Sequence, residues 1–512
     1  MENSRSGNAS RTFVFGVIEK VISIFFPFII RTIIIYKLGN EYLGLNGLFT
    51  SILNLLSISE LGISSAIAFC LYKPISENDD KTIGALMRLM RNIYKIIGAI
   101  ILLLGLAVLP FLSKLISGTY PSSINLYILY LIYLLNTVAP YFLFSYRAVL
   151  IDACQKGAIN HLINSSAELL KYVIQIIVLF VFTNYYVYIV FLPIFTIVAS
   201  LATEFISIKK YPNIKLVGSV SREHITFIKK KVGILFAHSV AARLTTSVDN
   251  IIISAFLGLT IVARFDNYQY VYTAITGFLI IAYRAIKPIM ANSYYVDGSD
   301  NKLAVYNSMR LFSFWASMFT SVCLFCLFQP FMTIWVGIEN CLPFSNVVVI
   351  VLYFYSNAVR LYFANTYIDI LGLWNKTLFR QILASIANLA LDLILVRTLG
   401  VFGIILSSFV TNFIIALPLD VLIVTKELKW EKVSTSFFKL IISFALTVEM
   451  CIFTYRFIGF VQISGVLGLF VKGMLCLLIP NVLFVICFSG KKEFRFMMVR
   501  LKSLFIRGRK NA

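Results

Sequence analysis

The sequence is poor in charged residues, and acidic side chains are the scarcer of the two charged classes. Of its 512 residues, 13% are charged, whereas soluble domains carry about 25% charged residues. There are only three histidines, and the eight cysteines form no Cys/His cluster with the spacing of a zinc site. No GxxxxGK[ST] phosphate-binding loop occurs. These absences argue against a soluble catalytic domain, a metal centre and direct use of ATP by this chain.

Hydrophobic residues make up 59% of the chain, and they lie in long apolar runs. A run of about 20 apolar residues spans the hydrocarbon core, and it must be helical because its backbone polar groups have no water to bind. The sequence therefore predicts an all-α integral membrane protein with about fourteen transmembrane helices. The first apolar run lacks an Ala-x-Ala type cleavage site, so we expect a retained helix and no signal peptide.

The basic residues indicate how the chain is oriented. The net charge is +22, and the lysines and arginines cluster beside apolar runs, as at 229–231 and in the tail from 491 to 510. Such clusters suit anionic lipid headgroups better than nucleic acid. With the N-terminus inside, the inner segments hold about 34 Lys and Arg and the outer loops about half a dozen. We therefore expect both termini to be cytoplasmic.

Two short stretches of the chain recur at nearly the same spacing. Residues 31–39 and 250–258 share an Ile-Ile run and a terminal Leu-Gly, at an offset of about 219 residues. Residues 138–142 and 359–363 share Val-x-x-Tyr-Phe at an offset of about 221 residues. The offset corresponds to six spans, so both halves keep one orientation. We predict two pseudo-symmetric six-helix lobes around a central cleft, followed by two C-terminal helices.

This repeat sets the predicted domain boundaries. They are an N-lobe at 1–208, a cytoplasmic linker at 209–224, a C-lobe at 225–425, a two-helix appendage at 426–490 and a basic cytoplasmic tail at 491–512.

Three arginines lie in predicted spans without an acidic residue one turn away on the same helix: Arg31, Arg243 and Arg360. An ionised side chain at the bilayer centre costs about 2.5 to 3.5 kcal/mol on insertion scales, so each needs a partner, a water-filled cavity or a function. One alternative is that they line a cleft and bind phosphate. The other is that they reach the membrane interface, or pair across helices with Glu60, Asp249, Asp369 or Asp392. The sequence leaves both alternatives open.

One face of the predicted seventh helix is polar. Ser239, Arg243, Thr246 and Asn250 recur at helical spacing and should lie along a single face. Arginine can donate two parallel hydrogen bonds to phosphate oxygens, so a cationic cleft there would suit a diphosphate group.

The intramembrane acids are candidates for ion coupling. Glu60, Asp249 and Asp369 have the fewest adjacent bases and could carry a coupling Na⁺ or H⁺. A buried carboxylate can also stay protonated and act only as a hydrogen-bonding group. Lys171 has Glu168 one turn away, so we interpret these two as a structural ion pair. No other cofactor or metal is predicted.

The opening of the chain resembles a known family. The run R-T-I-I-I-Y-K-L-G-N-E-Y-L-G-L-N-G-L-F at 31–49, followed by I-S-E-L-G-I-S-S-A at 58–66 and Lys-Pro at 73–74, is similar to the start of Wzx-type polysaccharide flippases. Asp-Asn at 249–250 with Phe-Leu-Gly at 256–258 resembles the seventh helix of the wider MATE-like MOP transporter superfamily. The resemblance implies export of undecaprenyl-diphosphate-linked oligosaccharide repeat units across the bacterial plasma (inner) membrane for surface polysaccharide biosynthesis. It also implies alternating access, and partners among polysaccharide polymerase and assembly proteins.

Three functions compete. A lipid-linked oligosaccharide flippase requires a cationic cleft, whereas a MATE-like ion-coupled exporter of small organic cations should prefer an acidic cavity. A membrane-embedded polysaccharide polymerase would need catalytic groups on a sizeable loop, and the outer loops are short. We therefore expect a transporter and no enzyme. We also expect a monomer, because a two-lobed cleft needs no second chain.

Overall fold

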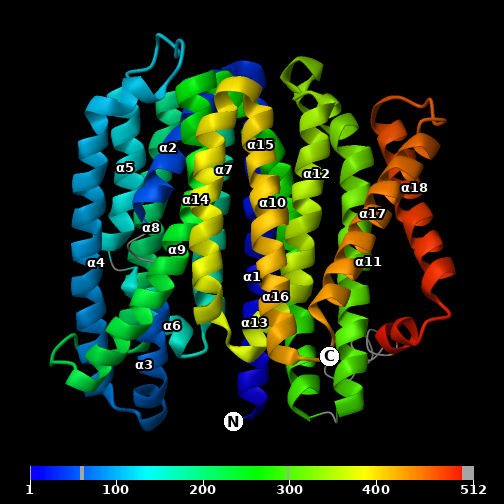
Figure 1. Cartoon of the computed structure of the whole chain (residues 1–512). Helices are drawn as coiled ribbons and strands as arrows, with labels where there is room; N and C mark the ends of the chain where they lie inside the picture. Colours follow the sequence, from blue (N-terminus) through cyan, green and yellow to red (C-terminus); the bar gives the residue numbers. More distant parts are fainter. Residues whose placement is uncertain (1, 58–62, 144, 297–298, 499–512) are drawn as a thin grey trace. The chain divides into compact units, whose positions relative to one another are not determined.

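The computed structural model describes residues 2–57, 63–143, 145–296 and 299–498. Within these ranges every regular element is a helix (Figure 1), as the sequence predicted. The chain divides into two compact units, residues 1–263 and 264–512. Each unit is described by itself below.

Unit 1 contains the first nine α-helices. They are α1 (Glu2–Lys37), α2 (Asn40–Leu56), α3 (Ile63–Glu77), α4 (Asp80–Val108), α5 (Leu126–Phe142), α6 (Tyr146–Ala153), α7 (Gly157–Val181), α8 (Tyr185–Lys210) and α9 (Arg222–Leu257), with the 3-10 helix η2 (Leu109–Leu115) after α4. Helix α1 packs on α7, α5 on α8, and α2 on α9. The predicted boundary at residue 225 would put α9 in the second lobe, whereas α9 packs here within the first unit. The lobe boundaries remain a prediction.

Polar caps explain where several of these helices begin. The side chain of Asp79 accepts a hydrogen bond from the Thr82 backbone at 3.1 Å. Asn125 and Asn184 do the same for the first turns of α5 and α8. Each cap satisfies an amide that has no partner inside its own helix.

Unit 2 contains most of α10 (Leu259–Val296), which begins in unit 1, and all later helices. These are α11 (Ser299–Val336), α12 (Phe344–Val359), α13 (Asn365–Leu371), α14 (Trp374–Leu399), α15 (Val401–Val410), α16 (Leu417–Leu428), α17 (Val433–Ile458) and α18 (Gly465–Phe488), with the short 3-10 helix η3 (Ile338–Asn340). Two π-helical turns, η4 (Arg360–Ala364) and η5 (Thr411–Ala416), interrupt the helices α12–α13 and α15–α16. Helix α11 packs on both α17 and α18 (Figure 1).

The membrane assignment is supported by length and by exposure. Twelve helices of the described chain are long and apolar enough to cross a bilayer, and thirteen if α5 and α6, bent by 51°, form one span. Helices α2 and α3 flank residues 58–62, which lie outside the described part. The count is close to the predicted fourteen but does not reach it in the described residues. Large apolar side chains such as Leu103 and Phe379 are exposed, and lipid rather than water is a suitable surrounding for them.

The two sequence echoes fall at matching breaks in the helices. Gly39 separates α1 from α2 at φ 109° and ψ 167°, and Gly258 separates α9 from α10 at φ 87° and ψ 172°. A positive φ favours glycine because it has no Cβ. The second echo lies at the end of α5 and at the junction of α12 with η4. The first echo thus adopts the same local structure in both places, whereas the second falls at a helix end in α5 and within a continuous helix at η4.

A glycine allows α2 to pack closely on the start of α10 within unit 1. A Cβ added to Gly44 on α2 would lie 2.2 Å from the carbonyl oxygen of Leu259 at the start of α10. Only a residue without a side chain permits that approach, which is typical of packed membrane helices.

Residues of the predicted linker pack on α4. The carbonyl oxygen of Gly218 accepts a hydrogen bond from Arg88 at 3.2 Å. Close to it, the carbonyl oxygen of Lys215 would be 2.0 Å from a Cβ at Gly84. The segment is therefore anchored to unit 1.

Candidate functional site

The predicted polar face of the seventh helix lies on α9. Thr246 is exposed, and Ser239 and Arg243 are half-buried. Asn250 instead donates a hydrogen bond from Nδ2 to Oγ of Ser51 on α2 at 3.0 Å. Asn250 thus contributes to helix packing, whereas the other three are accessible in part.

Arg31 is half-buried near the end of α1. It interacts electrostatically with the hydroxyl groups of Tyr185 and Tyr188 on α8. Tyr133 on α5 completes this aromatic group, because its hydroxyl lies 3.0 Å from that of Tyr185. Arg31 therefore lies beside a cluster of tyrosine hydroxyls.

Arg360 has an acidic partner on another helix. Its Nε atom donates to Oδ2 of Asp420 at 3.0 Å, and the side chain of Asp420 is fully buried, with 0% exposed. A second guanidinium is also present, since Nε of Arg380 lies 2.8 Å from Oδ1 of the same carboxylate. The partner is none of the four acids that the sequence suggested, because Asp420 is 60 positions away from Arg360.

The π-helical turns position this cluster. Arg360 is the first residue of η4, and Asp420 follows η5 in the first turn of α16. Helix α16 packs against η4, and α12 packs against η5. Two guanidinium groups face one carboxylate, so unit 2 carries one excess positive charge at this point. π-Helical turns of this kind often mark functional sites.

A polar network extends from the cluster along η5. Nδ2 of Asn412 donates to Oδ1 of Asn357 at 2.5 Å. Nδ2 of Asn357 in turn donates to the hydroxyl of Tyr272 at 2.7 Å. Tyr272 also interacts electrostatically with Arg360. The network therefore connects α10, α12 and η5.

The three acids predicted for ion coupling have different surroundings. Glu60 lies outside the described residues. Asp249 is buried on α9, with 8% exposed. Asp369 on α13 is paired with Lys287 on α10 and accepts a hydrogen bond from the Tyr283 hydroxyl at 2.5 Å. A salt bridge to a nearby lysine leaves Asp369 less suited to bind a mobile cation, although its role in coupling stays a prediction.

Unit 1 contains a polar cavity that the sequence reasoning missed. Its volume is about 390 Å³, and it lies between α1, α5, α6, α7 and α8. Glu19 lines it from α1, and Asn164, Glu168 and Lys171 line it from α7. Thr196 and other small polar residues of α8 form the opposite wall. This is an unusual surface inside a bundle of apolar helices.

Charged groups in and beside this cavity are only partly paired. Oε2 of Glu19 lies 2.5 Å from Nδ1 of His161. Glu168 interacts electrostatically with Lys171 and with Glu19, yet its Oε2 atom is buried without a hydrogen-bond partner in the described structure. The ammonium of Lys171 lies 4.4 Å from the ring centroid of Tyr172. Glu168 therefore retains acceptor capacity toward the cavity.

A helical pattern could have revealed this site. Asn160, Asn164, Glu168 and Lys171 recur at intervals of four, four and three residues, so they share one face of α7. The interpretation of Glu168 and Lys171 as an isolated pair overlooked that polar face. The acidic member from α1, Glu19, could not be assigned without tertiary structure.

Unit 2 contains an apolar cavity of about 400 Å³. It is lined from α10, α11 and α18 by residues that include Ile275, Phe328 and Leu469. Such a surface can accept a hydrocarbon chain.

Comparisons with solved structures identify the fold. The MurJ lipid II flippase in an inward closed conformation superposes with a TM-score of 0.68 at 16% identity, covering 93% of this chain and 98% of that one. An inward-facing multidrug resistance MATE transporter of the MOP superfamily superposes with a TM-score of 0.60 at 15% identity, covering 83% of this chain and 98% of that one. A mutant of the Vibrio cholerae MATE transporter VcmN superposes with a TM-score of 0.56 at 14% identity, covering 84% of this chain and 99% of that one. These similarities show that the chain shares the fold of these three proteins.

Comparison with curated proteins finds no significant match. Residues 12–293, more than half of the chain, match the family described as "Polysaccharide biosynthesis protein". The match begins in α1 and ends in α10, and it includes the Leu-Gly echoes at Gly39 and Gly258. The chain therefore belongs to the polysaccharide biosynthesis protein family.

Proposed function

We propose that this protein is a flippase that moves undecaprenyl-diphosphate-linked oligosaccharide repeat units across the bacterial plasma membrane by alternating access. The units would be used for surface polysaccharide biosynthesis. The observation that carries the proposal is the combination of family and fold: the family match covers 12–293, and the fold is shared with a lipid II flippase over 98% of that flippase.

Arginines supply the charge that a diphosphate requires. Arg243 is partly accessible on α9, and the Arg360–Asp420–Arg380 cluster leaves one positive charge in unit 2. Guanidinium groups bind phosphate oxygens through paired hydrogen bonds and remain charged at any physiological pH. We assign phosphate binding to Arg243, and we assign to Asp420 the role of holding Arg360 and Arg380 in place. Arg31, beside tyrosine hydroxyls, is suited to the sugar or phosphate head.

The lipid tail needs a different environment from the head. The apolar cavity between α10, α11 and α18 is lined mainly by hydrocarbon side chains, such as those of Ile275 and Phe328. Burying each methylene group contributes about 0.8 kcal/mol, so a polyprenyl chain favours such a surface over water. The head can then follow a polar path while the tail stays in an apolar environment.

The polar cavity of unit 1 is suited to energy coupling. Glu19 and Glu168 present carboxylates within the membrane, and a conformational change that alters their hydration would alter their affinity for H⁺ or Na⁺. We propose this pair as the coupling site, in place of the more fully paired Asp369. We propose that the protein works as a monomer, because a two-lobed cleft needs no second chain. The distribution of basic residues supports a cytoplasmic location for both termini.

Deletion of the gene in its native bacterium tests the proposal. We expect undecaprenyl-diphosphate-linked units to accumulate inside the cell and surface polysaccharide to disappear. Complementation should succeed with wild type, fail with Arg243→Ala and recover in part with Arg243→Lys, because lysine keeps the charge and loses the paired donors.

Protein abundance in the membrane is the control for each variant. If polysaccharide and linked units are unchanged by deletion, while efflux of small organic cations falls, the protein is an exporter and the proposed cargo is wrong.

A further inference from the structure

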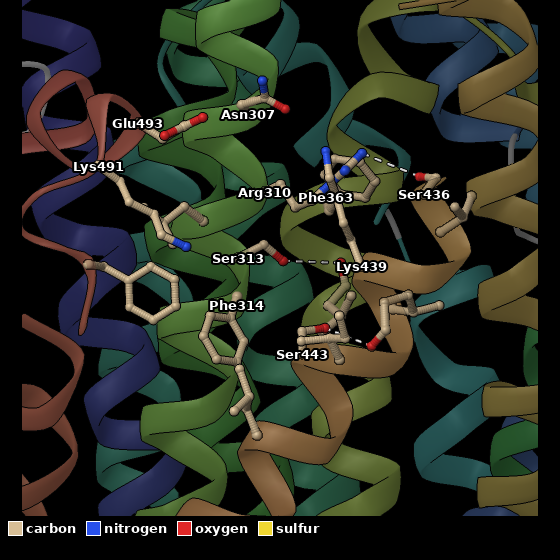
Figure 2. A pocket seen from close by; sticks show the side chains of 17 residues that line it. Asn307, Arg310, Ser313, Phe314, Phe363, Ser436, Lys439, Ser443, Lys491 and Glu493 are labelled. Atoms are coloured by element: carbon tan, nitrogen blue, oxygen red, sulfur yellow. Dashed lines mark hydrogen bonds between the residues drawn. The ribbon is translucent and has the colours of Figure 1, made fainter. Parts of the chain in front are cut away.

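A second cavity in unit 2 combines cationic and apolar walls. Its volume is about 330 Å³, and it lies between the beginning of α11, the beginning of α17 and the residues that follow α18. Figure 2 shows Arg310, Lys439 and Lys491 around the same hollow, each from a different one of these segments. Neither the proposed cargo path nor the coupling site uses these residues.

Glu431 holds basic side chains in place at the cationic wall of this cavity. It accepts hydrogen bonds from Arg310 NH1 at 2.9 Å, from Lys439 Nζ at 3.0 Å and from the Tyr306 hydroxyl at 2.9 Å. Arg310 lies further toward the interior and also donates to Ser436 at 3.3 Å. Arg310 alone can neutralise Glu431, so the charge of Lys439 is in excess.

The two lysines lie at the rim. The side chain of Lys439 is 43% exposed, and Lys491 is exposed with its ammonium 4.5 Å from the ring centroid of Phe488. Lys492 and Arg495 lie one and four residues further along the chain and are also exposed. Glu493 is the one acidic side chain among the residues that line the cavity. The rim therefore attracts anions.

The remaining wall is apolar. Phe314, Phe488 and Leu446 contribute to it, and the rings of Phe314 and Phe488 lie 5.8 Å apart. The polar groups on this wall are already bonded, since Ser443 donates to the Leu440 carbonyl at 2.8 Å and lies 3.0 Å from the Tyr355 hydroxyl. A ligand here must be charged at one end and apolar at the other.

We propose that this cavity binds one anionic glycerophospholipid of the phosphatidylglycerol class. The phosphate lies between Lys439 and Lys491, and an acyl chain extends along Phe314 and Leu446. Basic pockets between membrane helices are known binding surfaces for anionic headgroups. The lipid contacts α11, α17 and the end of α18 together, so it acts as a ligand that holds the C-terminal helix pair against α11.

Lipid selectivity of the purified full-length protein tests this. After exchange into mixed micelles or nanodiscs with phosphatidylglycerol and phosphatidylcholine, native mass spectrometry counts the retained lipids. Wild type should retain phosphatidylglycerol preferentially, and each rim lysine should contribute about fivefold to that preference. Lys439→Gln with Lys491→Gln should bring the two lipids close to parity. Folding should persist, because Arg310 still pairs with Glu431.

Two further variants separate charge from shape. Lys426→Gln with Lys429→Gln removes two exposed lysines that do not line the cavity, and it should leave the preference unchanged. Leu446→Trp fills the apolar wall while all charges remain, and it should abolish lipid retention. The residue is 39% exposed, so the larger ring can be accommodated without disturbing the packed interior.

The thermal midpoint provides a second readout. Phosphatidylglycerol should raise the thermal midpoint of wild type and should not raise that of the Lys439/Lys491 variant or of Leu446→Trp. The proposal is overturned if wild type retains both lipids equally, or if the Lys426/Lys429 control loses as much of its preference for phosphatidylglycerol as the rim variant does. It is also overturned if inorganic phosphate or glycerol phosphate raises the thermal midpoint as much as the lipid does.

Discussion

Nε of Arg360 lies 3.0 Å from Oδ2 of Asp420, although the two residues belong to different helices. Arg360 is the first residue of the π-helical turn η4, and Asp420 follows the π-helical turn η5. Arg380 approaches the other oxygen of the same carboxylate at 2.8 Å. An arginine with no acidic residue one turn away on its own helix thus shares a fully buried acid with a second arginine. The arrangement explains how two guanidinium groups are tolerated inside unit 2.

Removing the shared acid should destabilise the protein strongly. Asp420→Asn leaves two buried guanidinium groups without a counter-charge, which typically costs about 3 to 5 kcal/mol. We expect a large loss of folded protein in the membrane and a lower thermal midpoint after purification. Arg380→Gln is the matched control, since it keeps the Arg360–Asp420 pair and should cost less. Equal stability of Asp420→Asn and wild type would show that the ion pairs contribute nothing.

Glu431 predicts a pH dependence of stability. Burial raises the pKa of this carboxyl, but the hydrogen bonds and charges of Arg310 and Lys439 outweigh it and lower the pKa from 4.5 to about 2. A depressed folded-state pKa contributes stability above about pH 4.5, and that contribution is lost as the pH falls toward 2. Glu431→Gln should therefore lower the thermal midpoint at pH 7 and differ little from wild type near pH 2. If the difference in thermal midpoint between the two proteins stays constant from pH 7 to pH 2, this prediction is contradicted.

The close contact at Gly44 predicts that a larger residue at this position destabilises the protein. Gly44→Val places carbon atoms where the carbonyl oxygen of Leu259 lies, 2.2 Å from the new Cβ, so α2 and the start of α10 must separate. Overpacking of this kind costs about 1 to 3 kcal/mol. Gly473→Ala on α18 is the control, because its Cβ would meet nothing within 4 Å. The thermal midpoint should fall for the first variant only.

The polar cavity of unit 1 predicts which acid couples transport to an ion gradient. Glu168→Gln removes a carboxylate with acceptor capacity, and transport into vesicles should lose most of its dependence on an imposed H⁺ or Na⁺ gradient. Asp369→Asn should retain that dependence, because Asp369 is paired with Lys287. If Asp369→Asn loses the gradient dependence and Glu168→Gln keeps it, the coupling residue is Asp369 and not Glu168. If neither variant changes the gradient dependence, no coupling site lies at these residues.

The sequence predicts those parts of the structure that depend on local patterns. Long apolar runs predict the membrane helices, and the Leu-Gly echoes predict the breaks at Gly39 and Gly258, where a positive φ requires glycine. The polar stripe on α7 is also present in the sequence as a helical spacing, of which the predicted ion pair of Glu168 with Lys171 is only one part.

Contacts between distant segments were not predictable in the same way. Asp420 and Arg360 meet through the packing of α16 on η4, and nothing in the spacing of the two residues indicates it. Glu431 likewise joins Arg310 to Lys439 across three segments. Charge pairs between helices depend on the tertiary fold, whereas periodicity within one helix can be read from the chain alone.

Transport by the purified protein tests the central claim most directly. Proteoliposomes would contain the full-length protein and an undecaprenyl-diphosphate-linked oligosaccharide with a fluorescent sugar, and a membrane-impermeant reagent would quench the sugars exposed outside. Wild type should make sugars of the inner leaflet accessible to the quencher, and Arg243→Ala, reconstituted at equal density, should not. If wild type leaves the inner-leaflet sugars protected at the level of protein-free liposomes, the protein is not a flippase for this class of lipid.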